Sequence, residues 1–182
     1  MCSINFFTSK EVEIKITEVI VSQYLAALEM LKQTIVKCPE EIWNDPADKN
    51  KFWQVAYHAI FYIHLYLQDS EITFEPWYKH REEYQFLGHV PWSSHAAPRL
   101  GEPYNKATVL EYLAFCQQQV RSRVPHIDLE GMPGFYWLPF SNLELQIYSI
   151  RHAQQHTGEL MERLGTRADL ELDWIGTIPA EG

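Results

Sequence analysis

The sequence predicts an all-α protein: a four-helix bundle that forms a single domain over residues 1–182. Four long segments carry apolar residues at helical spacing, and no stretch shows the alternation of apolar and polar residues expected of a half-buried strand. Three of these segments open with Ser or Thr followed three residues later by Glu, the capping-box spacing. With 182 residues, 46% of them hydrophobic, the chain can bury one sizeable core.

The first two helices are bounded by local signals. The first is predicted over roughly Ser9–Lys37, opened by the capping pair Thr8 and Glu11 and stopped by Pro39. The second is predicted over about Lys49–Leu67 and is apolar on nearly all sides. A helix of that kind is usually central in the fold.

The third helix is predicted from Thr108, which pairs with Glu111 as a capping box, to Val124. Before it lies a long insertion, about residues 69–106, which is too long for a plain turn and too aromatic for a disordered segment. A short extra helix is expected within it after Pro76. Long ordered loops of this kind often line functional sites.

The fourth helix is predicted over Asn142–Leu164. Ser141 and Glu144 provide its capping box, and Gly165 suits the C′ position that follows the helix end.

A histidine pair on the fourth helix is the main candidate for chemistry. His152 and His156 stand four residues apart, so both project from one face with Cβ atoms about 6 Å apart. Two such nitrogens can share one divalent metal ion, and one further ligand completes a three-ligand site with an open position. Gln154 and Gln155 between them exclude a metalloprotease motif. Glu159 falls on the same helical stripe.

The second helix offers two candidates for the third ligand. His58 and His64 both lie in apolar settings, where a neutral core histidine is the ordinary interpretation of either. Their spacing points them about 120° apart, so they do not readily share one ion. These residues alone leave the choice between them open.

Two sequence motifs resemble the DinB/YfiT-like family. They are Trp53-Gln-Val-Ala-Tyr-His58 on the second helix and His152-Ala-Gln-Gln-His156-Thr-Gly-Glu-Leu160 on the fourth, and the similarity extends over roughly Ser9–Gly176. The resemblance implies an up-up-down-down four-helix bundle in which His58, His152 and His156 bind the metal. Members of this family include metal-dependent thiol transferases that use low-molecular-weight thiols. The long aromatic insertion is not a general family feature.

Three neutral imidazoles favour zinc or nickel, with iron and manganese as further options. Without a carboxylate ligand the ion keeps much of its charge, so it can ionise a thiol or lower the pKa of water. The family resemblance implies a thiol S-transferase acting on a small-molecule substrate, and a metal-dependent hydrolase is the second possibility. The remaining alternative is a non-enzymatic, stress-associated metal-binding protein whose site is closed by a fourth ligand from His80, His89 or His95.

Three further side chains near the predicted site have either a functional or an ordinary interpretation. Glu159 is the candidate catalytic residue, orienting a histidine or relaying a proton, although an exposed helix glutamate is an equally common finding. Tyr62 and Tyr148 lie one turn from a predicted ligand, where a packing role is the commoner one.

Composition excludes several other classes. The net charge of −9 and the absence of a basic run argue against a nucleic-acid partner. The most apolar stretch, Val55–Leu67, is too short to span a membrane. With no secretory signal at the start and three cysteines without metal-type spacing, reduced thiols in a cytoplasmic protein are expected. The aromatic helix faces predict a homodimer.

Overall fold

The computed structural model describes residues 15–91, 94–95 and 97–180, and within these residues helices are the regular elements, with no strand. This confirms the all-α prediction. The elements in chain order are α1 (Ile16–Lys37), α2 (Glu40–Trp43), α3 (Phe52–Tyr66), α4 (Lys106–Arg123), the 3-10 helix η1 (Val124–His126) and α5 (Asn142–Ala168).

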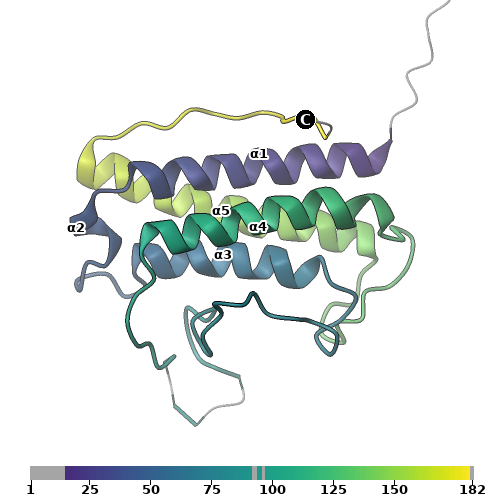
Figure 1. Ribbon diagram of the computed structural model, residues 1–182, viewed down its shortest axis with the longest axis horizontal. Helices are drawn as coiled ribbons and strands as arrows, with labels where there is room; N and C mark the ends of the chain where they lie inside the picture. Colours follow the sequence, from purple (N-terminus) through teal and green to yellow (C-terminus); the bar gives the residue numbers. More distant parts are fainter. Residues whose placement is uncertain (1–14, 92–93, 96, 181–182) are drawn as a thin grey trace, which may run out of the picture.

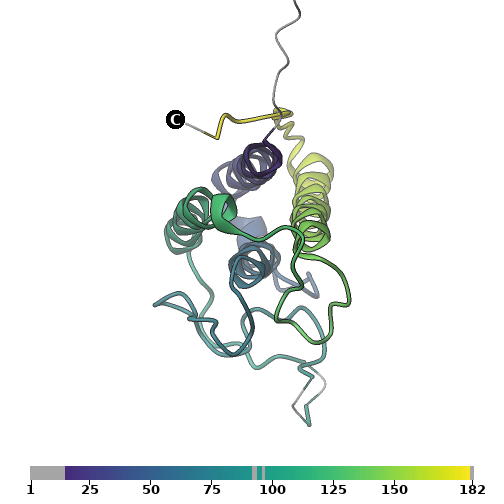
Figure 2. The same cartoon turned by 90° about the vertical axis from the view of Figure 1, so that its right-hand side faces the viewer.

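The four long helices lie side by side around one core, as the end-on view of Figure 2 shows. Helix α3 packs against α4 and α5, and α1 packs against the same two helices. Helices α1 and α5 run in one direction and α3 and α4 in the other (Figure 1). On going around the bundle in the order α1, α5, α3 and α4, the helix directions are up-up-down-down. In the order of the chain, they are up-down-down-up. Helices α3 and α4 run in the same direction because the insertion returns the chain to the end at which α3 began.

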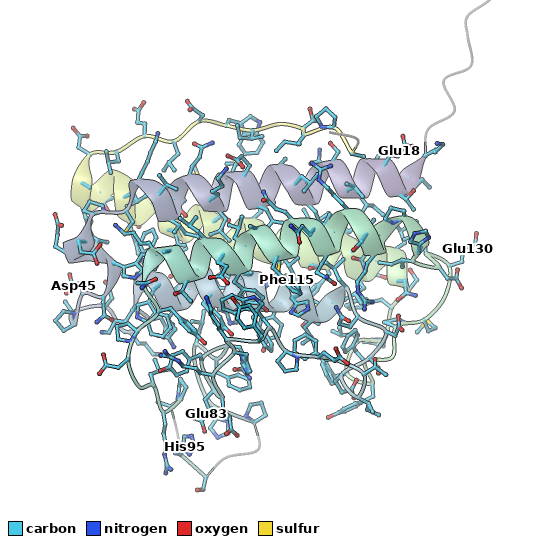
Figure 3. The ribbon with its side chains drawn as sticks, viewed as in Figure 1. Glu18, Asp45, Glu83, His95, Phe115 and Glu130 are labelled. Carbon is cyan, nitrogen blue, oxygen red and sulfur yellow. The ribbon has the colours of Figure 1, made fainter. Side chains whose placement is uncertain are left out.

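Helix α3 is covered on nearly all sides, as its apolar sequence predicts, and His58 and Tyr62 are its partly exposed residues. The side that neither α4 nor α5 covers is covered by the described residues of the insertion between α3 and α4 (67–91, 94–95 and 97–105). Their side chains lie beneath α3 in Figure 3, with Glu83 and His95 at the outer end. Aromatic contacts hold the insertion there: the Trp53 and Tyr84 rings are 5.4 Å apart. Aromatic side chains bury large areas, so this insertion contributes strongly to the core.

Several local predictions were wrong. The insertion contains turns but no helix among its described residues, whereas the unpredicted α2 forms from Glu40 to Trp43. Helix α4 begins earlier than expected because Asn105, rather than Thr108, is the N-cap: its side chain accepts the Thr108 backbone N–H at 2.9 Å. Glu111 instead bonds to side chains of the insertion.

At the start of α1, the predicted capping pair Thr8 and Glu11 lies outside the described residues. The described helix begins at Ile16 and ends at Lys37, close to Pro39 as expected.

Helix α5 runs past Gly165 to Ala168, so Gly165 is an interior residue and not the C′ residue. The C-cap residue that follows Ala168 is Asp169, whose φ of 54° lies in the left-handed region. Its backbone N–H donates to the Gly165 carbonyl at 3.2 Å, and that of Leu170 donates to Leu164 at 3.3 Å. The carbonyls at the end of the helix are satisfied without a glycine at the turn.

After α5 the chain runs extended beside α1, as Figure 1 shows. The Gln23 side chain donates to the Gly176 carbonyl at 3.1 Å, which ties this segment to α1. None of the described helices has the length and apolar character needed to cross a membrane.

Replacing Asp169 with Gly should raise the free energy of unfolding by about 0.5–1 kcal/mol. The left-handed conformation costs a residue with a Cβ roughly 1–2 kcal/mol, which exceeds the roughly 0.5–1 kcal/mol of extra freedom that glycine gives the unfolded chain. Urea unfolding followed by circular dichroism measures the change. Asp169→Ala is the matched control, because it removes the carboxylate and keeps the Cβ. A gain in the alanine variant equal to that in the glycine variant would contradict the conformational explanation.

Candidate metal centre

Three histidines from two helices meet in a partly buried cluster. His58 comes from α3, and His152 and His156 come from α5; one nitrogen from each lies within 4.8 Å of the others. The Nε2 atoms of His58 and His152 are 3.1 Å apart. Two nitrogens bound to one tetrahedral zinc ion, each about 2.0–2.1 Å from it, would be separated by about 3.3 Å. The spacing of this pair therefore fits a shared divalent ion, and the His156 nitrogen lies within 4.8 Å of both.

The insertion fixes the orientation of His58. The backbone carbonyl of Gln85 lies 2.6 Å from His58 Nδ1. Because a carbonyl can only accept, Nδ1 carries the proton and Nε2 is left with a free lone pair. The carbonyl is placed by a turn in which the Phe86 N–H donates to the Glu83 carbonyl at 3.0 Å and Glu83 adopts a φ of 68°. Metal-binding histidines commonly hold such a second partner.

His156 has a carboxylate partner on its own helix. Its Nδ1 lies 3.3 Å from Glu159 Oε2. Glu159 also forms an ion pair with Arg163, which is itself 3.7 Å from Asp48. The carboxylate is therefore held between a histidine and an arginine one turn further on. This arrangement suits the orienting role considered for Glu159, and nothing in it tests a catalytic role.

His152 is placed between aromatic rings. The Tyr148 ring is nearly parallel to it, at 10° and 6.4 Å, and the Tyr62 ring is 5.4 Å away. Its Nδ1 is buried and has no hydrogen-bond partner in the described structure. With its Nε2 facing that of His58, the ring presents a nitrogen to the cluster centre. A metal ion at that point would give both Nε2 lone pairs an electrophilic partner.

Burial keeps two of the three imidazoles uncharged. Desolvation lowers the pKa of His58 to about 3, helped by the neighbouring His156 and His152 and opposed by the hydrogen bond to Gln85. Desolvation, together with His156, lowers the pKa of His152 to about 4. Neutral imidazole is the form that binds metal, so neither ring must lose a proton at neutral pH before it can act as a ligand.

The other histidines of the second helix and the insertion have different partners. His64 Nδ1 lies 3.1 Å from the Tyr112 hydroxyl of α4, and His80 Nδ1 lies 2.7 Å from that of Tyr57. His95 pairs with Glu83, and His89 is exposed. Within the described ranges, the metal-type cluster contains no fourth His, Cys, Asp or Glu. Among the described residues, neither His80, His89 nor His95 is a fourth ligand that closes the cluster.

The cluster borders an open cavity of about 460 Å³. The cavity is lined by α5 residues: Tyr148, Arg151, His152, Gln154 and Gln155. A second cavity, of about 410 Å³, lies between the end of α3, the end of α4 and the start of α5, and none of the three histidines lines it. The first cavity therefore gives one predicted ligand contact with solvent.

Comparisons with family models, with curated proteins and with solved structures find no match to this chain. The functional argument therefore rests on the residues themselves. The structure brings together all three histidines predicted as ligands and excludes His64 from the cluster. Sequence reasoning missed the Gln85 carbonyl, because a backbone contact made by a loop leaves no residue-type signal.

His64 should make folding sensitive to acid. Its pKa in the folded protein is lowered by burial to about 4, against 6.5 for a free histidine. Between these values the unfolded chain binds a proton that the folded chain does not, so stability is lost as pH falls from 6.5 toward 4. Relative to a His64→Leu variant, the wild type should lose roughly 2–3 kcal/mol between pH 7.5 and 4.5. Urea unfolding of both proteins at the two pH values measures this, and equal losses in both would disprove it.

Proposed function

We propose that this chain is a DinB/YfiT-like four-helix bundle that binds one divalent metal ion through His58, His152 and His156. The observation that carries the proposal is the convergence of three histidine nitrogens within 4.8 Å from two separate helices. We further propose that the protein is a metal-dependent transferase that joins a low-molecular-weight thiol to a small electrophilic molecule.

The donor set supports zinc or nickel, because neutral imidazoles suit borderline divalent ions and no carboxylate belongs to the cluster in the described chain. A bound ion of this kind keeps its charge and favours the thiolate form of a thiol placed at its open position. Other residues of the protein hold two of the three histidine rings in orientation. The Gln85 carbonyl holds the His58 ring, and Glu159, fixed by Arg163, holds the His156 ring.

Two observations favour an open, reactive site over a closed structural one. Among the described residues no fourth protein ligand joins the cluster, and His152 lines a cavity of about 460 Å³ that is open to solvent. Three protein ligands with one free position are typical of catalytic metal sites. Hydrolysis by a metal-activated water molecule is the second reaction that such a site supports.

Metal content provides the first test. The purified, tag-free protein should contain close to one zinc or nickel ion per chain by elemental analysis, and His152→Ala/His156→Ala should contain none. His58→Ala should also lose the metal, because it removes one of three ligands from two helices. His64→Ala is the matched control and should keep the metal, since His64 bonds to Tyr112 instead.

Circular dichroism confirms that each variant is folded before its metal content is compared. Loss of metal in His64→Ala with retention in His58→Ala would reverse the ligand assignment. A wild-type protein that stays metal-free after incubation with zinc and with nickel would overturn the proposal.

A thiol-transfer assay tests the reaction. The zinc- or nickel-loaded protein should accelerate the coupling of a small thiol to 1-chloro-2,4-dinitrobenzene, followed by the absorbance of the thioether, and His152→Ala/His156→Ala should not. Esterase activity on 4-nitrophenyl acetate, with no thiol transfer, would favour the hydrolase instead. If neither reaction is faster than in the double variant, the metal is not catalytic toward these substrate classes.

A further inference from the structure

We propose that Arg151 binds a carboxylate on the molecule that occupies the cavity beside the metal centre, so that the site selects small ligands carrying one carboxylate. This inference rests on the proposed metal site and names the chemical class of its ligand. Arg151 directly precedes the predicted ligand His152, and both residues line the cavity of about 460 Å³.

The guanidinium of Arg151 is available to a ligand. Arg151 is exposed, and no hydrogen bond or ion pair joins its side chain to any described residue. The two other arginines of α5 are both occupied: Arg163 binds Glu159, and Arg167 binds Asp45 and Asp48. Arg151 is therefore the one arginine of α5 whose guanidinium has no partner among the described residues.

No acidic residue of α5 lies within one turn of Arg151: Glu144 precedes it by seven positions and Glu159 follows it by eight. Glu159, two turns further along, is already shared between His156 and Arg163. The positive charge therefore faces the cavity and solvent. It is screened by salt but not cancelled by a neighbouring carboxylate.

The rest of the lining indicates the class of anion. Arg151 is the only charged residue among the five described residues that line this cavity, so it is the partner for one negative charge on the part of the ligand away from the metal. A planar guanidinium forms two parallel hydrogen bonds with a carboxylate. The amides of Gln154 and Gln155 add donors and acceptors, and the half-exposed Tyr148 ring, stacked beside His152, supplies an apolar wall. The expected ligand is thus a small organic acid with a group that can reach the metal.

Two matched thiols test this on the cobalt-loaded protein. 3-Mercaptopropionate carries a thiol and a carboxylate, whereas 3-mercapto-1-propanol has the same chain length and no charge. The charge-transfer absorbance of a cobalt–thiolate bond reports binding of each. The dissociation constant of the acid should be about tenfold lower than that of the alcohol, and Arg151→Gln should remove this difference while leaving binding of the alcohol unchanged.

Arg121→Gln is the matched control. Arg121 lies on α4, which does not pack against α5, and its guanidinium contacts the C-terminal segment, so its replacement should leave both dissociation constants unchanged. If both thiols bind equally in the wild type, or if Arg151→Gln weakens them equally, the carboxylate assignment is wrong while the metal site stands. If the protein binds no cobalt, the proposed metal site fails, and the role of Arg151 fails with it.

Discussion

The contact between α3 and α5 is the constraint on which the rest of the structure depends. These antiparallel helices contribute all three clustered histidines, so their register decides whether the rings meet. Polar links fix that register at both ends: Gln146 donates to the Tyr66 carbonyl at 3.4 Å, and Arg163 donates to the Asn50 carbonyl at 2.9 Å. A slip of one helical turn, about 5.4 Å, would separate nitrogens that now lie within bonding range of one ion.

The insertion completes what the helices begin. It covers the side of α3 that would otherwise face water, and burial by these surroundings keeps the His58 ring neutral. The same segment supplies the carbonyl that selects the tautomer of that ring. The aromatic side chains that stabilise the insertion therefore also hold the turn that orients His58 in the histidine cluster.

The sequence predicts those features of this fold that depend on a regular spacing of residues. Apolar spacing located the four long helices, and the four-residue interval paired His152 with His156. Residue spacing did not decide between His58 and His64 as the third ligand, because both lie in apolar settings. The structure separates them by direction, since His58 faces α5 and His64 faces Tyr112 of α4. Single local events were missed, among them the Asn105 cap, since each depends on one hydrogen bond rather than on a pattern. The predicted homodimer and the catalytic role of Glu159 stay predictions.

The bond from His58 to the carbonyl of Gln85 has a consequence for how this site changes over evolutionary time. Every amino acid carries a backbone carbonyl, so the orienting group survives any substitution at position 85 that leaves the path of the chain unaltered. What the site cannot tolerate is a change in loop length, because one residue added or removed before the turn would carry the carbonyl away from the ring. The residue at position 85 can therefore vary, whereas the number of residues before the turn cannot change without moving the carbonyl away from His58.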